Sequence, residues 1–420
     1  MPLPERNLQI SSNDTRAVAQ RGWLVTITCA GVLLALGVLY AWSVFKANIP
    51  VEWGWTESQK TLPYSVACVV LSTMAPLGAR LLLRYGPPAV VSVGGVMAGL
   101  GVIISSFSSS PWIFTLAFGV LLGSGIGFVY ASASPTALSW FPASRSGLVT
   151  GIVVAGFGLG SIWVAPLARS LIESVGLQAT MFYLGIAMLI VVVAFAQMLK
   201  FPPAGFVPHE DKPAAVELNV KADYPLRETV RTWQFYFLWI TFAFGAGAGL
   251  MVIGNLAIIV KDQIGLPALS AIAVSALSLG NSSGRILYGV LSDKIGRKNV
   301  LMIAFLGQAV LVSSLYFMGT DSPLTSTPIL IVFVALIGAN YGANLAVFPA
   351  MVKDYFGSKH FAMNFSVVNT AWGLGGFMVS QLAGLIKDVY GSFDFAYLLA
   401  AGMLVAAAMI MFRIEITAIK

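Results

Sequence analysis

The sequence predicts an all-α membrane protein with twelve transmembrane helices in two pseudo-symmetric six-helix bundles. Its 420 residues are 58% hydrophobic and only 10% charged, with a mean hydropathy of +0.85, whereas soluble domains carry about 25% charged residues. Apolar runs of about 20 residues, enough for a helix to cross about 30 Å of hydrocarbon, recur along the chain. The two halves also share glycine and aromatic positions.

Twelve apolar runs define the predicted helices. Each is bounded by a loop that contains charged residues, proline or glycine. The runs cover residues 22–47, 58–83, 88–108, 112–140, 146–171, 178–199, 232–260, 267–291, 299–318, 327–352, 361–386 and 393–413.

Loop charges predict the orientation of these helices. If successive loops alternate between the two sides, 18 of the 24 lysines and arginines lie on the side of both termini and 5 on the other. Because basic loops stay in the cytoplasm, we expect both termini there. The longest polar stretch separates the sixth and seventh runs, and we interpret it as a cytoplasmic linker. The expected domains are a tail (1–21), an N-terminal bundle (22–200), a linker (201–231), a C-terminal bundle (232–414) and a tail (415–420).

An internal repeat supports two bundles. Adding 215 to residue numbers of the first half brings an FGLG string onto a WGLG string, with a phenylalanine seventeen residues before each glycine pair. The matched pairs are Gly123 and Gly338, Gly127 and Gly342, Phe141 and Phe356, Gly158 and Gly373, Leu159 and Leu374, Gly160 and Gly375, and Gly176 and Gly391. Six-helix repeats are typical of secondary transporters.

Arg285 is the one charged residue between Gln263 and Ser292. All 17 acidic residues fall in termini, in loops or close to the ends of apolar runs, so no carboxylate is expected at its depth. A guanidinium does not lose its proton on burial. We therefore expect Arg285 to bind an anion that arrives from solution.

A polar stripe surrounds this arginine, because residues three and four apart share a helix face. Ser278, Asn281 and Ser282 lie on the face of Arg285, and such a stripe points into a bundle, since lipid offers no hydrogen bonds. The alternative is that Arg285 extends toward the headgroups near Asp293. Candidate pocket residues on other helices are Leu33, Tyr40, Tyr130, Tyr341, Asn369 and Trp372.

The loop from Gly289 to Arg297, GVLSDKIGR, resembles the loop motif of the major facilitator superfamily, with Gly289, Asp293, Gly296 and Arg297 at its defining positions. We expect Asp293 to approach the N-terminus of a neighbouring helix and the basic residues to meet lipid headgroups. The equivalent loop of the first half keeps Arg84 and Gly86 but has Leu83 in place of the acid.

Within that superfamily the chain resembles the branch of monocarboxylate transporters and oxalate/formate exchangers, through LYAWSVF in the first run, SWFPASRSGLVTG after the fourth, and Asn281 and Arg285 in the eighth. It resembles a bacterial homologue of the monocarboxylate transporters. Family members have an aspartate at the position of Asn281, a lysine at that of Val44 and, in the exchangers, a lysine at that of Trp372. One intramembrane cation in place of two favours one carboxylate in the substrate.

The resemblance implies a secondary transporter that moves lactate or pyruvate across a bacterial cytoplasmic membrane by alternating access, with a proton. The alternatives are an exchanger of oxalate- or formate-type anions and an anion channel. No enzyme is expected, because His209 and His360 both lie in polar stretches and no HExxH string occurs. We expect no cofactor, metal or nucleic acid, and a functional monomer.

Overall fold

The computed structural model describes residues 12–142, 145–203, 206, 223–320, 322, 325–357 and 359–413, and all regular structure within them is helical. The first half contains α1 (Ser12–Ala35), η1 (Gly37–Leu39), α2 (Trp42–Lys46), η2 (Val51–Trp53), α3 (Glu57–Tyr85), α4 (Pro87–Ser106), α5 (Pro111–Phe114), η3 (Thr115–Leu122), α6 (Gly123–Leu138) and α7 (Ser146–Ala196). The second contains α8 (Leu226–Thr229), α9 (Trp233–Ile258), η5 (Ile259–Gln263), η6 (Pro267–Leu269), α10 (Ser270–Ile295), α11 (Arg297–Ser314), η7 (Leu315–Phe317), α12 (Thr327–Phe356), α13 (Phe361–Val368), α14 (Thr370–Tyr390) and α15 (Asp394–Arg413).

Helices occupy all twelve predicted runs. In the described part of the chain, nine helical stretches are long and apolar enough to cross a membrane. One of them, Gly147–Ala196, contains two predicted runs, because α7 turns at Gly176, whose φ of 82° lies in the left-handed region. The remaining two runs are α10 and α14, which carry polar residues in addition to apolar ones.

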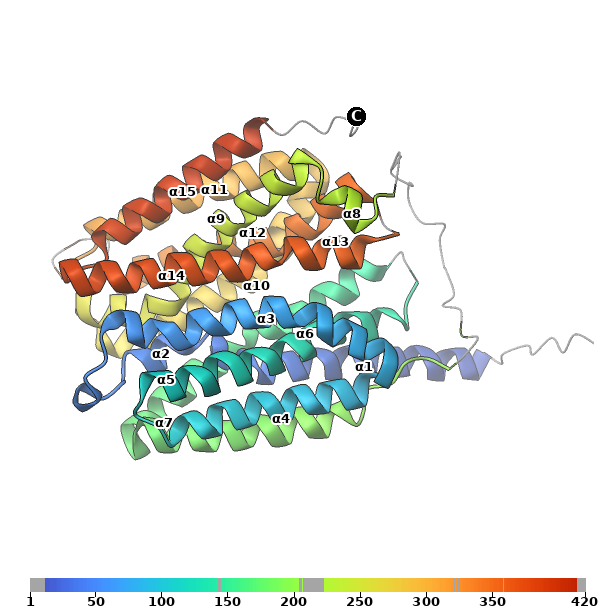
Figure 1. The fold of residues 1–420 in the computed structure, drawn as a ribbon, viewed down its shortest axis with the longest axis horizontal. Helices are drawn as coiled ribbons and strands as arrows, with labels where there is room; N and C mark the ends of the chain where they lie inside the picture. Colours follow the sequence, from blue (N-terminus) through green and yellow to red (C-terminus); the bar gives the residue numbers. More distant parts are fainter. Residues whose placement is uncertain are drawn as a thin grey trace, which may run out of the picture.

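The helices form two groups that lie side by side with their axes roughly parallel (Figure 1). In the first group α4 and α1 pack on α7, and in the second α10 packs on α12. Across the boundary α3 packs on α14, α7 on α10 and α2 on α9. We call the end of the molecule at which α1 begins the terminus side, at the right of Figure 1, and the opposite end the far side.

The internal repeat is visible in the backbone and in the packing. Gly176 and Gly391 both have positive φ, at 82° and 74°, each where one span turns into the next. A Cβ on Gly158 would lie 2.4 Å from Ser282 Oγ across the boundary, and one on Gly373 would lie 2.0 Å from Ser72 Oγ. Matched glycines therefore bring the two groups together at two equivalent boundaries.

Two spans are interrupted near the boundary between the groups. The first changes from α1 to the 3-10 turn η1 and then to α2, and Tyr40 lies directly after η1. The eleventh breaks between α13 and α14 at Asn369, three residues before Trp372. Interrupted helices inside membrane proteins occur where backbone is shielded by protein or lines a cavity.

The ends of the predicted bundles differ from the helix bounds. Helix α1 begins at Ser12 and not after residue 21, because no proline or glycine interrupts the sequence between Ser12 and Gln20. Within the predicted linker, Tyr224 donates its N–H to Phe356 O at 3.0 Å, which ties that end to α12. The tail from 415 to 420, residues 1–11 and most of the linker, with His209, lie outside the described residues.

Candidate anion site around Arg285

The polar stripe of α10 faces α7 of the other helix group. Arg285 is 9% exposed, and its Nη1 donates a 2.9 Å hydrogen bond to Val154 O on α7. Ser278 Oγ of α10 also forms a hydrogen bond with Ser161 Oγ of α7. Arg285 lies ten residues from the terminus-side end of α10 and fifteen from its far-side end, or about 15 and 22 Å at 1.5 Å per residue. The guanidinium therefore points across the boundary and does not extend toward Asp293.

Three polar atoms of this stripe are buried without a hydrogen-bond partner among the described residues: Arg285 Nη2, Asn281 Nδ2 and Ser282 Oγ. The amide orientation follows from chemistry, because Arg285 Nε is a donor and must face Asn281 Oδ1, 3.2 Å away. Asn281 Nδ2 then points elsewhere. Within the described chain no carboxylate forms an ion pair with Arg285. Both unpaired nitrogens need an acceptor.

The FGLG string supplies the wall opposite Arg285, which the sequence did not indicate. A Cβ on Gly158 would lie 3.5 Å from Arg285 Nη2, so only glycine leaves this space free. Phe157, the preceding residue, has its ring centroid 4.9 Å from that of Tyr40 and 5.7 Å from that of Tyr130. The repeat marked this string, but nothing in the sequence showed that it faces Arg285.

A chain of hydrogen bonds joins three predicted pocket residues. Trp372 Nε1 donates to Tyr341 Oη at 2.8 Å, and Tyr341 Oη lies 3.2 Å from Tyr40 Oη. Trp372 and Tyr341 belong to the second group and Tyr40 to the first. Tyr40 and Tyr130 both pack against Phe157, which precedes the glycine that faces Arg285. Four predicted residues thus surround one region with Arg285.

The other predicted pocket residues have less specific surroundings. Leu33 is fully buried in the core of the first group. Asn369 is half-buried at the break between α13 and α14, where its backbone carbonyl accepts from Trp372 N at 3.1 Å. Its position beside Trp372 supports a role in fixing the helix break.

Lys46 is a buried cation that the sequence interpretation missed. Its Nζ donates to Asn255 Oδ1 at 2.6 Å and to Thr61 Oγ1 at 2.7 Å, and it lies 3.3 Å from Glu57 Oε2. The expectation of a single intramembrane cation is therefore wrong. Lys46 has a carboxylate partner, however, so Arg285 remains the buried cation without one in the described chain.

The loop motif forms ion pairs within the protein. Asp293 accepts a 2.5 Å hydrogen bond from the side chain of Arg297, the first residue of α11. Arg297 also reaches Asp354 of α12 at 3.3 Å, so its guanidinium pairs with two protein carboxylates. Gly296 has a φ of 90° at the turn. At Gly289 a Cβ would meet only Ala346, at 3.9 Å.

The string GNSSG from Gly280 to Gly284 has the spacing of the GxSxG motif of serine hydrolases. That motif requires a turn from strand to helix, whereas this string lies inside the helix α10. Among the described residues no three His, Cys, Asp or Glu side chains form a metal-binding group.

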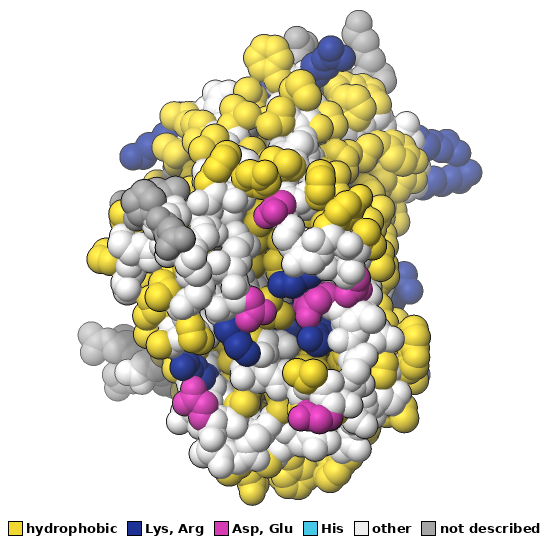
Figure 2. All heavy atoms as spheres, turned by 90° about the vertical axis from the view of Figure 1, so that its left-hand side faces the viewer, with side chains coloured by type: hydrophobic (Ala, Val, Ile, Leu, Met, Phe, Trp, Pro, Cys, Tyr) yellow, Lys and Arg dark blue, Asp and Glu magenta, His cyan; other side chains and the backbone are white. Residues whose placement is uncertain are grey.

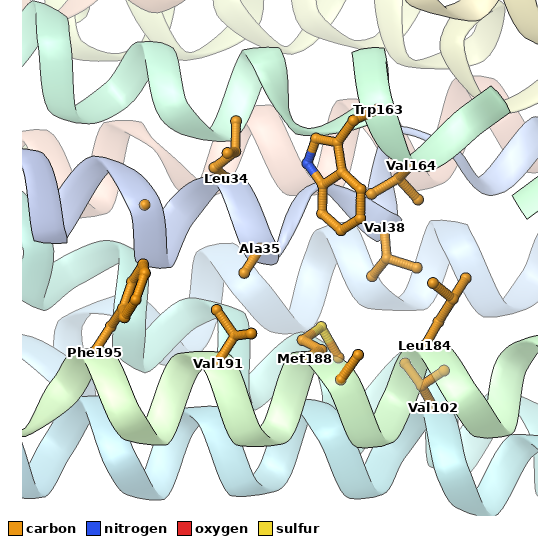
Figure 3. A pocket seen from close by; sticks show the side chains of 12 residues that line it. Leu34, Ala35, Val38, Val102, Trp163, Val164, Leu184, Met188, Val191 and Phe195 are labelled. Carbon is orange, nitrogen blue, oxygen red and sulfur yellow. The ribbon is translucent and has the colours of Figure 1, made fainter. Parts of the chain in front are cut away.

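A cavity of about 260 Å³ lies within the first helix group, away from Arg285 (Figure 3). Residues of α1, η1, α4 and α7 line it, with the Trp163, Met188 and Phe195 side chains around the space. All lining side chains are apolar apart from the indole nitrogen of Trp163. An anion would lose its hydration there without gaining a charged partner.

Comparisons with known proteins agree with the sequence resemblance. The family profile described as Major Facilitator Superfamily matches residues 27–324 and 246–418. The MFS-type transporter YhjX of Escherichia coli (strain K12) is 30% identical over 354 residues, 84% of this chain and 85% of that protein. The oxalate:formate antiporter of Oxalobacter formigenes is 26% identical (93% and 90% covered), and monocarboxylate transporter 12 of Rattus norvegicus is 25% identical (93% and 84%).

Proposed function

The chain belongs to the major facilitator superfamily and is an integral, multi-pass membrane transporter, and from that premise we propose that it carries a small monocarboxylate such as lactate or pyruvate by alternating access. The observation that carries this proposal is the pair of buried, unpartnered donors on Arg285 and Asn281. A carboxylate satisfies them, because a guanidinium gives it short, charge-assisted hydrogen bonds of fixed direction.

The charge inventory supports one carboxylate in the substrate. Lys46 is paired with Glu57, which leaves Arg285 as the cation available to an anion in the described core. Trp372 stands where the oxalate/formate exchangers that the sequence resembles have a lysine. A second substrate carboxylate would thus be buried without a cation, at a large desolvation cost. An α-oxygen beside the single carboxylate would serve as acceptor for Asn281 Nδ2.

Aromatic rings complete the proposed pocket. Tyr40 and Tyr130 each pack against Phe157, in tilted and edge-on geometry respectively, and Tyr341 joins them through its hydrogen bond with Tyr40. Such rings supply apolar surface for a short carbon chain and hydroxyls for its polar end.

Bonds between the two helix groups close the far side. Asp388 of α14 accepts the N–H groups of Glu57 and Ser58, at 2.6 and 2.9 Å. Arg169 of α7 donates to Pro267 O at 2.7 Å. Acidic and basic side chains gather near the middle of this face (Figure 2). Together with the Lys46 network, these bonds support a far-side gate that is shut in this conformation.

The start of α7, at the terminus side of the same boundary, has free space beside it. A Cβ added to Gly147 or Gly151, near the start of α7, would meet no atom within 4 Å, whereas one on Gly158, deeper in the helix, would collide with Ser282. The basic excess of the terminus-side loops supports placing that side in the cytoplasm of a bacterial cell. The proposed state is therefore open to the cytoplasm.

A co-transported proton is part of the proposal and is supported by the resemblance to monocarboxylate transporters. Asn281 does not ionise, so the proton would enter with the substrate carboxyl group and not on a side chain of α10 at that position. Anion exchange is the second candidate. The 26% identity to a protein named oxalate:formate antiporter favours it.

Uptake by purified protein in liposomes tests the substrate class. We expect saturable uptake of labelled lactate or pyruvate, competition by other C2 to C6 monocarboxylates, and weak competition by oxalate. An imposed inward proton gradient should raise uptake in symport and leave it unchanged in exchange. Preference for oxalate would overturn the monocarboxylate assignment, and substrate currents far above carrier turnover, without counterflow, would indicate a channel.

A further inference from the structure

The side chains of Trp372, Tyr341 and Tyr40 hold more donor hydrogens than they use in hydrogen bonds with one another. The indole nitrogen of Trp372 is a donor only, so Tyr341 Oη accepts from it at 2.8 Å. The two hydroxyls bring one proton each. The three groups thus hold three donor hydrogens but make two hydrogen bonds with one another.

One hydroxyl proton of the tyrosine pair is left over whichever way the Tyr40 to Tyr341 bond points. If Tyr341 donates to Tyr40, the spare proton is on Tyr40; if Tyr40 donates, it is on Tyr341. Donation by Trp372 polarises the Tyr341 hydroxyl and makes it a better donor, because hydrogen bonds in a chain strengthen one another. Trp372 therefore favours the order Trp372 to Tyr341 to Tyr40, with the spare proton on Tyr40.

The position of Tyr40 suits a ligand held by Arg285. Tyr40 is 2% exposed, and its ring lies 4.9 Å from that of Phe157. The residue after Phe157 is Gly158, which faces the Arg285 guanidinium. Tyr40 belongs to the first helix group, whereas Arg285 belongs to the second. A carboxylate between them would accept from both groups at once.

We propose that Trp372 is a positioning residue: by donating to Tyr341 it turns the Tyr40 hydroxyl into a hydrogen-bond donor for the substrate carboxylate. This inference rests on the proposed function. Trp372 would not touch the substrate, and its effect would pass through the two tyrosines. The arrangement selects a ligand whose polar end carries acceptors toward Arg285 and toward Tyr40.

A double-mutant cycle on lactate binding tests this role, with Trp372→Phe, Tyr40→Phe and the double variant, each reconstituted as the full chain. Both substitutions keep a ring and remove one donor. We expect Tyr40→Phe to weaken binding about tenfold and Trp372→Phe about threefold, the range for single hydrogen bonds. The double variant should bind as Tyr40→Phe does, because Trp372 acts only through that hydroxyl.

Unchanged binding in Trp372→Phe, or a double variant weakened by the product of the single effects, would overturn the proposal. If Trp372→Phe does not fold, Tyr341→Phe removes the bond that the Tyr40 hydroxyl accepts but leaves that hydroxyl in place, so it should weaken binding about threefold. Wild-type affinity in Tyr341→Phe, or a loss as large as in Tyr40→Phe, would overturn the proposal. The proposed function fails separately, if the wild type binds no monocarboxylate or Arg285→Ala binds as well as the wild type.

Discussion

Lys46 Nζ, in the first helix group, donates a 2.6 Å hydrogen bond to Asn255 Oδ1 in the second. Both side chains are fully buried, 209 residues apart in the sequence. Since the bond crosses the boundary on the far side, it can exist only while that side is closed. Its partners Thr61 and Glu57 stay with Lys46 on the first group, so Asn255 is the partner lost on opening.

Asn255→Ala should therefore favour opening of the far side. A hydrogen bond to a charged group contributes about 1.5–3 kcal/mol, so the open state should gain roughly tenfold or more in population. Cys68 is a native reporter, because it is buried against Gly376 of α14. With Cys29 replaced by alanine, an impermeant maleimide added from the far side should label Cys68 faster in the variant.

Thr136→Ala is the control for this measurement. Thr136 is also fully buried, but its hydroxyl bonds to Ser132 O within α6, so its loss should leave the labelling rate unchanged. Equal labelling in Asn255→Ala and the wild type would contradict a gate at Lys46.

Gly158→Ala should impair substrate binding. The added methyl would lie 2.4 Å from Ser282 Oγ and 3.5 Å from Arg285 Nη2, and overpacking of this kind costs about 1–3 kcal/mol. Lactate affinity should fall roughly tenfold. Gly151→Ala, two turns earlier on the same helix with open space around it, should bind normally; equal affinities for the two variants would place the substrate elsewhere.

Asn281→Asp should make binding depend on pH. The new carboxylate would lie against Arg285 Nε, where Asn281 Oδ1 is 3.2 Å away, and would compete with the substrate for the cation. At neutral pH lactate affinity should fall at least tenfold, and it should recover as acid protonates the carboxyl group. Isothermal titration at two pH values measures this; a variant with wild-type affinity at both values would remove Asn281 from the site.

The sequence predicted the helices well because each needs about 20 apolar residues, and it singled out Arg285 because one charge in such a stretch is conspicuous. The sequence did not single out Lys46 because it lies beside the end of its apolar run, where a lysine side chain normally extends to solvent. In the structure Lys46 is buried with Asn255, 209 residues away in the sequence, as its hydrogen-bond partner. The hydrogen bond between Tyr40 and Tyr341 likewise joins residues that are 301 apart in the sequence. Such contacts arise from the packing of one helix group on the other, which no local pattern records.

Uptake of labelled lactate by liposomes containing wild type, Arg285→Ala, Arg285→Lys or Arg413→Ala tests the central claim most directly. Arg413 is an exposed arginine at the end of α15 and serves as the control. We expect Arg285→Ala to lose uptake by tenfold or more, the range for a hydrogen-bonded charge. Arg285→Lys should keep only part of it, because an ammonium lacks the planar fork, and Arg413→Ala should match the wild type. Undiminished uptake in Arg285→Ala would contradict the account.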